Sequence, residues 1–378
     1  VAMSSDGTTL AAAYDQGIWK SIDSGATWFQ AYDTYMTSWS NLRDIAMSDD
    51  GGLMAVVEYS GALYTSSDAY QWNSPSSMSD DGAVTYDWQA IAMSADGSTI
   101  VAVAMVNHNG EGGVYLSTDS GANWNRVVFG GSASQNLVDV AVAGSGSRLS
   151  AVASGGQVWI SADAGVTWAT EPPAGITPAP TVPMAPAPTP APSASPRAWS
   201  AIASSADGAR LAATVSSGSI YTSADSGASW TEDATAGARN WASIAMSADG
   251  QRLAAVEGSV DLSYCDVYGS LWTSSDFGAS WTEQAGLGSN CWRGVAMSGD
   301  GATVATASDT KRLRCWHNGT PAGEVEAPRR VSGLCIAPLG DGQVLLACCA
   351  GELYAFPLPA LDKPPRRLLA HTSSVLTG

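Results

Sequence analysis

Ser21-Ile22-Asp23-Ser24-Gly25-Ala26-Thr27-Trp28 is the stretch that decides the fold, because the same eight-residue pattern, S-x-D-x-G-x-(T/S/N)-W, returns along the chain. The Asp can accept N–H bonds from the turn that it begins, and the Gly supplies the positive φ that such a turn often needs. The Trp can bury its indole at the start of a strand. Further copies occupy residues 117–124, 161–168, 223–230 and 274–281, with a copy one residue short at 66–72.

A second pattern, an apolar strand followed by a D-G turn and another apolar strand, alternates with the first. The residue before the turn Gly stands at positions 6, 50, 96, 145, 207, 249, 300 and 341. A period of roughly 40 to 50 residues is typical of four-stranded propeller blades. In one repeat we predict strands at residues 243–247, 252–257, 270–273 and 280–284. The chain is therefore predicted to be an all-β propeller of eight modules, which could close with seven or eight blades.

The eight-residue pattern resembles the Asp-box (BNR) repeat of sialidases, sortilin-type receptors and photosystem II assembly factors, all of which are β-propellers. In that family the box is a turn between the two outer strands of a blade, far from the central axis where ligands bind. The resemblance covers residues 1–301 and implies a structural role for these residues. They are Asp23, Asp68, Asp119, Asp163, Asp225 and Asp276, with Trp28, Trp124, Trp168, Trp230 and Trp281.

Composition and charge limit the partners. The net charge is −18, but residues 302–378 hold eight Lys and Arg against six Asp and Glu, so residues 1–301 carry −20. That region would repel nucleic acid, which only the tail could attract. No apolar run is long enough to span a membrane. Residues 171–196 contain ten of the 18 prolines and are predicted to be an exposed insertion between blades.

Catalysis is the weakest of the functional hypotheses. A sialidase-like glycosidase would need three arginines around the axis, but Arg148, Arg210 and Arg252 recur at one place after three D-G turns, which favours solvent-facing turn residues. The three His residues are scattered, and no Cys/His cluster has metal spacing. No catalytic, cofactor-binding or metal site is predicted. Cys265 and Cys291 could pair across neighbouring repeats in an oxidising compartment.

The tail, residues 302–378, carries a different series of motifs. In order they are S-D-T-K-R-L at 308–313, R-R-V-S-G-L at 329–334, G-E-L-Y-A-F-P-L at 351–358 and L-L-A-H-T-S-S-V-L at 368–376. This series resembles the WD-repeat, non-catalytic subunit of tRNA (guanine-N7)-methyltransferase, with departures such as Glu352 for the family's Asp. The resemblance implies contact with tRNA phosphates or with the catalytic subunit, which would carry S-adenosylmethionine. The candidate contact residues are Lys311, Arg312, Arg314, Arg329 and Arg330.

We therefore predict a non-enzymatic scaffold whose most specific implied role is to support tRNA guanine-N7 methylation. The alternative is an Asp-box propeller that binds glycans, peptides or photosystem assembly partners. The first role implies the nucleus, and the second implies the secretory route or a plastid. The chain starts at Val1 in the middle of a repeat, so we expect a fragment whose targeting is open. A change of repeat type near residue 302 is also what a fusion of unrelated halves would give.

Overall fold

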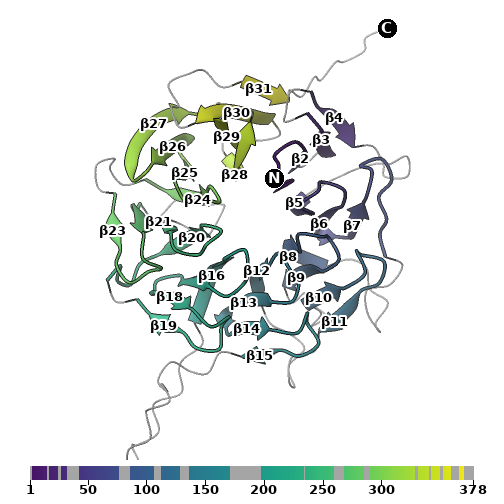
Figure 1. The fold of residues 1–378 in the computed structure, drawn as a ribbon, viewed down its shortest axis with the longest axis horizontal. Coiled ribbons are helices and arrows are strands. Elements are labelled where there is room, and N and C mark those ends of the chain that lie inside the picture. Colours follow the sequence, from purple (N-terminus) through teal and green to yellow (C-terminus); the bar gives the residue numbers. More distant parts are fainter. Residues whose placement is uncertain are drawn as a thin grey trace, which may run out of the picture.

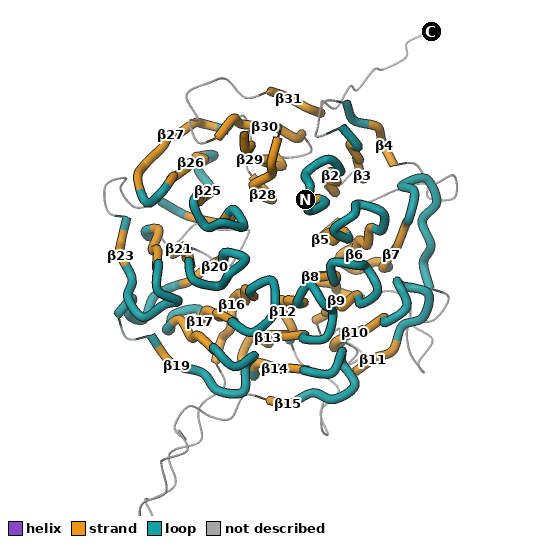
Figure 2. The backbone as a smooth tube through the Cα atoms, viewed as in Figure 1, coloured by secondary structure: helices purple, strands orange, loops and turns teal. Residues whose placement is uncertain are grey.

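The computed structural model describes residues 2–14, 17–23, 27–31, 42–75, 86–105, 112–127, 136–170, 197–233, 235–258, 268–284, 290–327, 331–339, 342–349, 352–358 and 366–369. These residues form 31 strands joined by turns and loops, and none of them is helical. Figure 2 shows this alternation of strand and loop around the whole molecule. The all-β class predicted from the repeats is confirmed.

The described strands form six antiparallel sheets, two of which join neighbouring repeats through pairing of β6 with β8 and of β13 with β16. Following the repeats, we divide the strands into eight successive units, called blades 1 to 8. Blade 1 contains β1 (Ala2–Met3), β2 (Leu10–Tyr14), β3 (Gly17–Ser21) and β4 (Phe29–Ala31). Blade 2 contains β5 (Leu42–Met47), β6 (Met54–Gly61) and β7 (Leu63–Ser66), with an isolated bridge between Thr65 and Asn73 at its outer edge. Blade 3 contains β8 (Tyr86–Met93), β9 (Ile100–Met105), β10 (Gly113–Ser117) and β11 (Asn125–Val127). Blade 4 contains β12 (Leu137–Val142), β13 (Leu149–Gly156), β14 (Val158–Ser161) and β15 (Ala169–Thr170).

The second half of the chain repeats the same order of strands. Blade 5 contains β16 (Arg197–Ser204), β17 (Leu211–Val215), β18 (Ile220–Ser223) and β19 (Thr231–Glu232). Blade 6 contains β20 (Trp241–Met246), β21 (Leu253–Glu257), β22 (Leu271–Ser274) and β23 (Thr282–Glu283). Blade 7 contains β24 (Trp292–Met297), β25 (Thr303–Ser308), β26 (Arg312–His317) and β27 (Thr320–Glu326). Blade 8 contains β28 (Val331–Leu339), β29 (Gly342–Cys349), β30 (Glu352–Leu358) and β31 (Arg366–Leu369).

The blades follow one another around a central opening, with the first strand of each blade innermost (Figure 1). Blade 8, at the yellow end of the colour scale, comes to lie beside blade 1. The fold is a β-propeller. The change of motif at residue 302 falls in the turn between β24 and β25, so blade 7 contains residues from both parts of the sequence.

Large aromatic side chains fill the interfaces between blades. Trp88, Trp241, Trp292 and Trp316 are almost completely buried. Trp292 and Trp316 of blade 7, for example, pack with Val256 and Leu271 of blade 6. The core is therefore distributed over the interfaces, so each blade depends on its neighbours for burial of its apolar face.

The D-G turns of successive blades are tied together by their backbones. One N–H to carbonyl bond of 2.7–2.9 Å joins each pair of turns from blade 1 to blade 7, as in the bond from Ala248 N to Gly299 O. The turn glycines are also close to the preceding blade. A Cβ on Gly301, where φ is +68°, would lie 2.5 Å from Arg252 Cδ. This glycine thus serves both the turn and the close approach of two blades.

Candidate functional site

The Asp-box turns share one hydrogen-bonded geometry, seen clearly in blade 6. Asp276 Oδ1 accepts from Ser274 Oγ at 2.8 Å and from Ser280 N at 2.9 Å, and its Oδ2 accepts from Ser280 Oγ at 2.5 Å. Gly278 N donates to Ser274 Oγ at 2.8 Å. Phe277 and Gly278 both have positive φ, of 58° and 84°. The sequence pattern therefore encodes a turn that is closed by its own side chains.

Each complete box in blades 3 to 6 folds back onto the D-G turn of its own blade. In blade 6 Phe277 N donates to Gln251 O at 2.8 Å, and in blade 5 Ser226 N donates to Ala209 O at 2.9 Å. Boxes and D-G turns thus lie on the same side of the ring, which we call the turn face.

Carboxylates gather on the turn face in two concentric sets. Hydrogen bonds from hydroxyl, amide and backbone N–H groups outweigh burial and lower the pKa of these side chains. The inner set with a lowered pKa is Asp6, Asp50, Asp96, Asp207, Asp249 and Asp300. The outer set with a lowered pKa is Asp68, Asp119, Asp163, Asp225 and Asp276. The turn face is therefore strongly negative at neutral pH.

The box glycine also joins neighbouring blades, because it packs on the third strand of the blade before it. A Cβ on Gly121 would lie 2.6 Å from Thr65 Cγ2, and a Cβ on Gly278 would lie 2.9 Å from Thr222 Cγ2. Gly165 approaches Leu116 and Gly227 approaches Ile160 in the same way. Four interfaces are therefore covered by a glycine turn of the following blade.

Blade 7 breaks this rule because a tight hairpin replaces the box. Asn318 and Gly319, with φ of 50° and 74°, form the turn, and Asn318 N donates to Ala302 O at 2.8 Å as Phe277 N does to Gln251 O. Trp316 pairs with Val304 as Ser274 pairs with Leu253, so the indole stands where a box has its serine. A Cβ on Gly319 would meet nothing within 4 Å. The glycine of this shorter turn does not reach blade 6.

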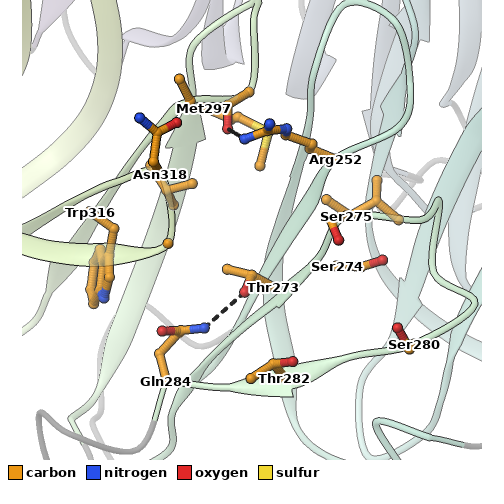
Figure 3. A pocket seen from close by; sticks show the side chains of 15 residues that line it. Arg252, Thr273, Ser274, Ser275, Ser280, Thr282, Gln284, Met297, Trp316 and Asn318 are labelled. Atoms are coloured by element: carbon orange, nitrogen blue, oxygen red, sulfur yellow. Dashed lines mark hydrogen bonds between the residues drawn. The ribbon is translucent and has the colours of Figure 1, made fainter.

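A pocket of about 300 Å³ lies at this interface, between blades 6 and 7. Figure 3 shows Arg252 and Met297 at one end, Trp316 and Gln284 at the other, and Thr273 between them. Thr273 is the residue of blade 6 that corresponds to Thr222 of blade 5, since each stands next to the box serine at the end of the third strand. Thr273 is half-buried beside the pocket, whereas its counterparts in blades 2, 3 and 5, which are Thr65, Leu116 and Thr222, are buried.

The pocket lining combines hydroxyl, amide and indole groups. Gln284 Nε2 donates to Thr273 Oγ1 at 2.9 Å, and Arg252 Nη1 donates to Gly301 O at 3.4 Å. Trp316 is only 2% exposed, and its Nε1 has no hydrogen-bond partner among the described residues. No carboxylate lines the pocket, although Asp276 and Asp300 stand in the turns beside it. Such a lining can bind a polar group that offers both hydrogen-bond donors and acceptors.

The three arginines weighed for a glycosidase do not converge. Arg148 donates to Ser226, the guanidinium of Arg210 lies 4.7 Å from the ring centre of Phe277, and Arg252 lines the pocket with Asn318. Each arginine thus lies against, or shares a pocket with, the residue before the turn glycine of the next blade. They occupy three different interfaces on the turn face. Arg252 is exposed, as the sequence predicted, whereas Arg148 and Arg210 are half-buried against the next blade.

The basic residues of the tail differ in their availability. Arg312 and Arg314 both pair with Glu324, and the guanidinium of the buried Arg314 lies 5.2 Å from the ring centre of Trp292. The single carboxylate of Glu324 offsets only one of the two positive charges, and Arg312 remains exposed. Lys311 is exposed in the β25–β26 turn with φ of 65°. Arg329 and Arg330 lie outside the described residues, so the predicted tRNA or partner contact stays a prediction.

Two carboxylates near the central opening were missed by the sequence analysis. Asp44 accepts from Ile45 N and from Ile91 N of the next blade, both at 2.9 Å. Asp139 repeats this bridge with Val140 N at 2.9 Å and Ile202 N at 3.0 Å. Burial raises the pKa of both, that of Asp139 to about 7 with a further contribution from the charge of Asp44. The absence of any acidic motif around them explains why they were missed.

Two cysteines have side chains that the structure describes. Cys291 is buried and disulfide-bonded, and its predicted partner Cys265 lies outside the described residues. Cys315 has a free, buried thiol whose pKa is raised to about 12 by burial. Among the described residues no group of three or more His, Cys, Asp or Glu could hold a metal ion. The same part of the chain contains no helix long and apolar enough to cross a membrane.

Comparison with known proteins supports the fold. The sequence matches no protein-family model and no curated protein. YCF48 bound to D1 peptide is 14% identical, with a TM-score of 0.54 over 83% of this chain and 92% of that chain. YCF48 from Cyanidioschyzon merolae is 15% identical, with a TM-score of 0.56 over 86% and 97%. The Dos1 propeller is 13% identical, with a TM-score of 0.61 over 88% and 84%. At these identities the likeness establishes a β-propeller and nothing finer.

Proposed function

We propose that this chain is a non-enzymatic scaffold that binds a polypeptide segment of a partner protein on its turn face, at the pocket between blades 6 and 7. The observation that carries the proposal is that pocket, which polar groups of two blades line, while the corresponding places at the four interfaces from blade 2 to blade 6 are closed by glycine turns. A peptide backbone offers the donors and acceptors that Thr273 and Gln284 can use. The similarity to YCF48, which has a structure with a D1 peptide, adds a propeller precedent for a peptide ligand.

The charge of the turn face selects the partner. Its carboxylates are ionised at neutral pH, and their lowered pKa values keep them ionised in mildly acidic solution, so a segment with Lys or Arg next to the pocket is favoured. An acidic segment or a nucleic acid would be repelled by the same residues. We therefore expect binding to weaken as salt concentration rises.

Selection of displayed random peptides on the purified chain tests this proposal. Enriched peptides should be basic, and their affinity should fall at least tenfold in a Thr273→Trp variant, whose indole fills the pocket. Val166→Trp is the matched control, because Val166 is 82% exposed in the blade 4 box on the same face. Failure to enrich any peptide, or equal affinity of wild type and Thr273→Trp, would contradict the proposal.

Support of tRNA guanine-N7 methylation is the second candidate, and it rests on the tail motifs and the exposed Lys311. Of the five basic residues proposed there, only Lys311 is described and has no ion pair among the described residues. Gel-shift titration of the chain with tRNA, alone and with a methyltransferase subunit, separates the two candidates. A shift that Lys311→Ala weakens would favour the second candidate over peptide binding.

A further inference from the structure

We infer that the pocket between blades 6 and 7 accepts a glycine-containing turn of the partner, which takes the place of the Asp-box that blade 7 lacks. This inference rests on the proposed function, because it specifies which part of a polypeptide enters the pocket. Its basis is the contact that the propeller makes with itself at four other interfaces.

The contact between a box glycine and the preceding blade indicates which backbone conformation a bound turn must have. In blades 3 to 6 the box glycine lies so close to Thr65, Leu116, Ile160 or Thr222 that a Cβ would collide or press against it. Its φ of 84° to 87° in these four boxes is one that side chains rarely adopt. A turn that fits the corresponding place on blade 6 should therefore also present glycine in this conformation.

The third strand of blade 6 offers the same surface as the strands that box glycines cover in other blades. Thr273 has the same residue type and strand position as Thr65 and Thr222, each of which lies under a glycine turn. Gly319 of blade 7 leaves it open, since a Cβ there would have no neighbour within 4 Å. Meanwhile the D-G turns of the two blades stay joined by the bond from Ala248 N to Gly299 O. The interface is thus open only in its outer part.

One unused polar group points to an occupant that is a polypeptide turn. Gln284 is held by its amide nitrogen on Thr273, which leaves its carbonyl oxygen as an acceptor at one end of the pocket (Figure 3). A backbone N–H group of a turn would donate to it. A volume of about 300 Å³ is at the lower end for ligand pockets, which suits a short turn.

The arginine pattern gives independent support. Arg148 and Arg210 each contact the residue that precedes the box glycine of the following blade. Arg252 occupies the same place on blade 6 but lines the pocket. We expect its guanidinium to contact the residue before the glycine of the bound turn.

A labelled peptide provides the test. The probe is the blade 5 box, Ser-Ala-Asp-Ser-Gly-Ala-Ser-Trp, with a Lys added at each end to suit the acidic face, and its binding to the full chain is measured by fluorescence anisotropy. A second probe has Val in place of Gly. We expect the Gly peptide to bind at least tenfold more tightly than the Val peptide, and Thr273→Trp or the exposed-site variant Thr282→Trp to abolish the difference.

A graft completes the design. Replacing residues 316–320 with residues 274–281 gives blade 7 its own box, which should fill the pocket and remove binding of the Gly peptide. Equal binding of the Gly and Val peptides, no binding of either, or unchanged binding after the graft would overturn the inference. If selected basic peptides still require an open pocket but carry no glycine turn, the proposed function stands and this inference fails. If no peptide of any kind binds, both fail.

Discussion

Gly278→Ala and Gly319→Ala form a matched pair that measures how strongly a box glycine joins two blades. Both glycines have positive φ, 84° and 74°, so each substitution by Ala should lower the free energy of unfolding by roughly 1–2 kcal/mol through the backbone conformation alone. At Gly278 the Cβ would also lie 2.9 Å from Thr222 Cγ2 and 3.5 Å from Leu253 Cδ1, whereas at Gly319 nothing is within 4 Å. Overpacking of this kind adds roughly 1–3 kcal/mol.

The expected losses are therefore about 1–2 kcal/mol for Gly319→Ala and about 2–5 kcal/mol for Gly278→Ala, from the sum of the backbone and packing costs. Urea unfolding followed by Trp fluorescence measures both, with the midpoint of each variant compared with wild type. Equal losses would refute the reasoning, because they would show that the box glycine is required for φ alone. The contact of box glycines with the preceding blade would then no longer support the inference that a glycine turn binds in the pocket.

The remaining predictions concern the carboxylates and the buried indoles. Asp139→Asn should flatten the dependence of stability on pH between about 4 and 7, because the raised folded pKa makes the wild type lose stability as pH rises through this window; urea midpoints across that range measure it. Asp276→Asn should lower the urea midpoint at pH 7, because the lowered pKa of Asp276 means that its ionised form stabilises the folded state. This stability is lost as pH falls below 3.8, so the difference in midpoint between wild type and variant should shrink there. Trp241→Ala should cost roughly 3–5 kcal/mol in the same assay, as the indole is fully buried, while Trp168→Ala at a half-buried position should cost less.

The fold could be predicted from the sequence because its two repeated turns are closed by local interactions. Asp276 binds Ser274 and Ser280 within the same eight residues, so the pattern and the structure carry the same information. The predicted strands at 243–247, 252–257, 270–273 and 280–284 correspond to β20 to β23 with shifts of one to two residues at most of their ends. Strand ends depend on pairing with neighbours, which a pattern of turns does not determine.

The pocket could not be predicted because it depends on residues from two blades. Thr273 and Gly319 are 46 positions apart, and their separation in space follows from a turn in blade 7 that is too short to cross the interface. The sequence did show that the box is lost after Trp281. It did not show that the box of one blade covers the third strand of the blade before it. Because of this contact, loss of the box in blade 7 leaves a pocket beside the third strand of blade 6.

The same dependence on neighbours explains the arginines and the central carboxylates. Arg210 is predicted to be a solvent-facing turn residue from its own repeat, but its guanidinium lies against Phe277 of the next blade. Asp139 accepts from Val140 N in its own strand and from Ile202 N in the next blade. Contacts of this kind need the relative position of two repeats.

A repeat protein creates a distinct site where one repeat departs from the rest. Among the described residues, the four interfaces from blade 2 to blade 6 are closed by a glycine turn of the following blade, whereas the interface between blades 6 and 7 has an open pocket. A ligand that recognised the features common to these five interfaces would find only the last one accessible. The D-G turns keep blades 6 and 7 in register through the Ala248–Gly299 bond, so the missing box changes the outer contact without separating the blades. Specificity for this interface then follows from geometry, because no Asp-box of blade 7 covers Thr273 and Gln284 of blade 6.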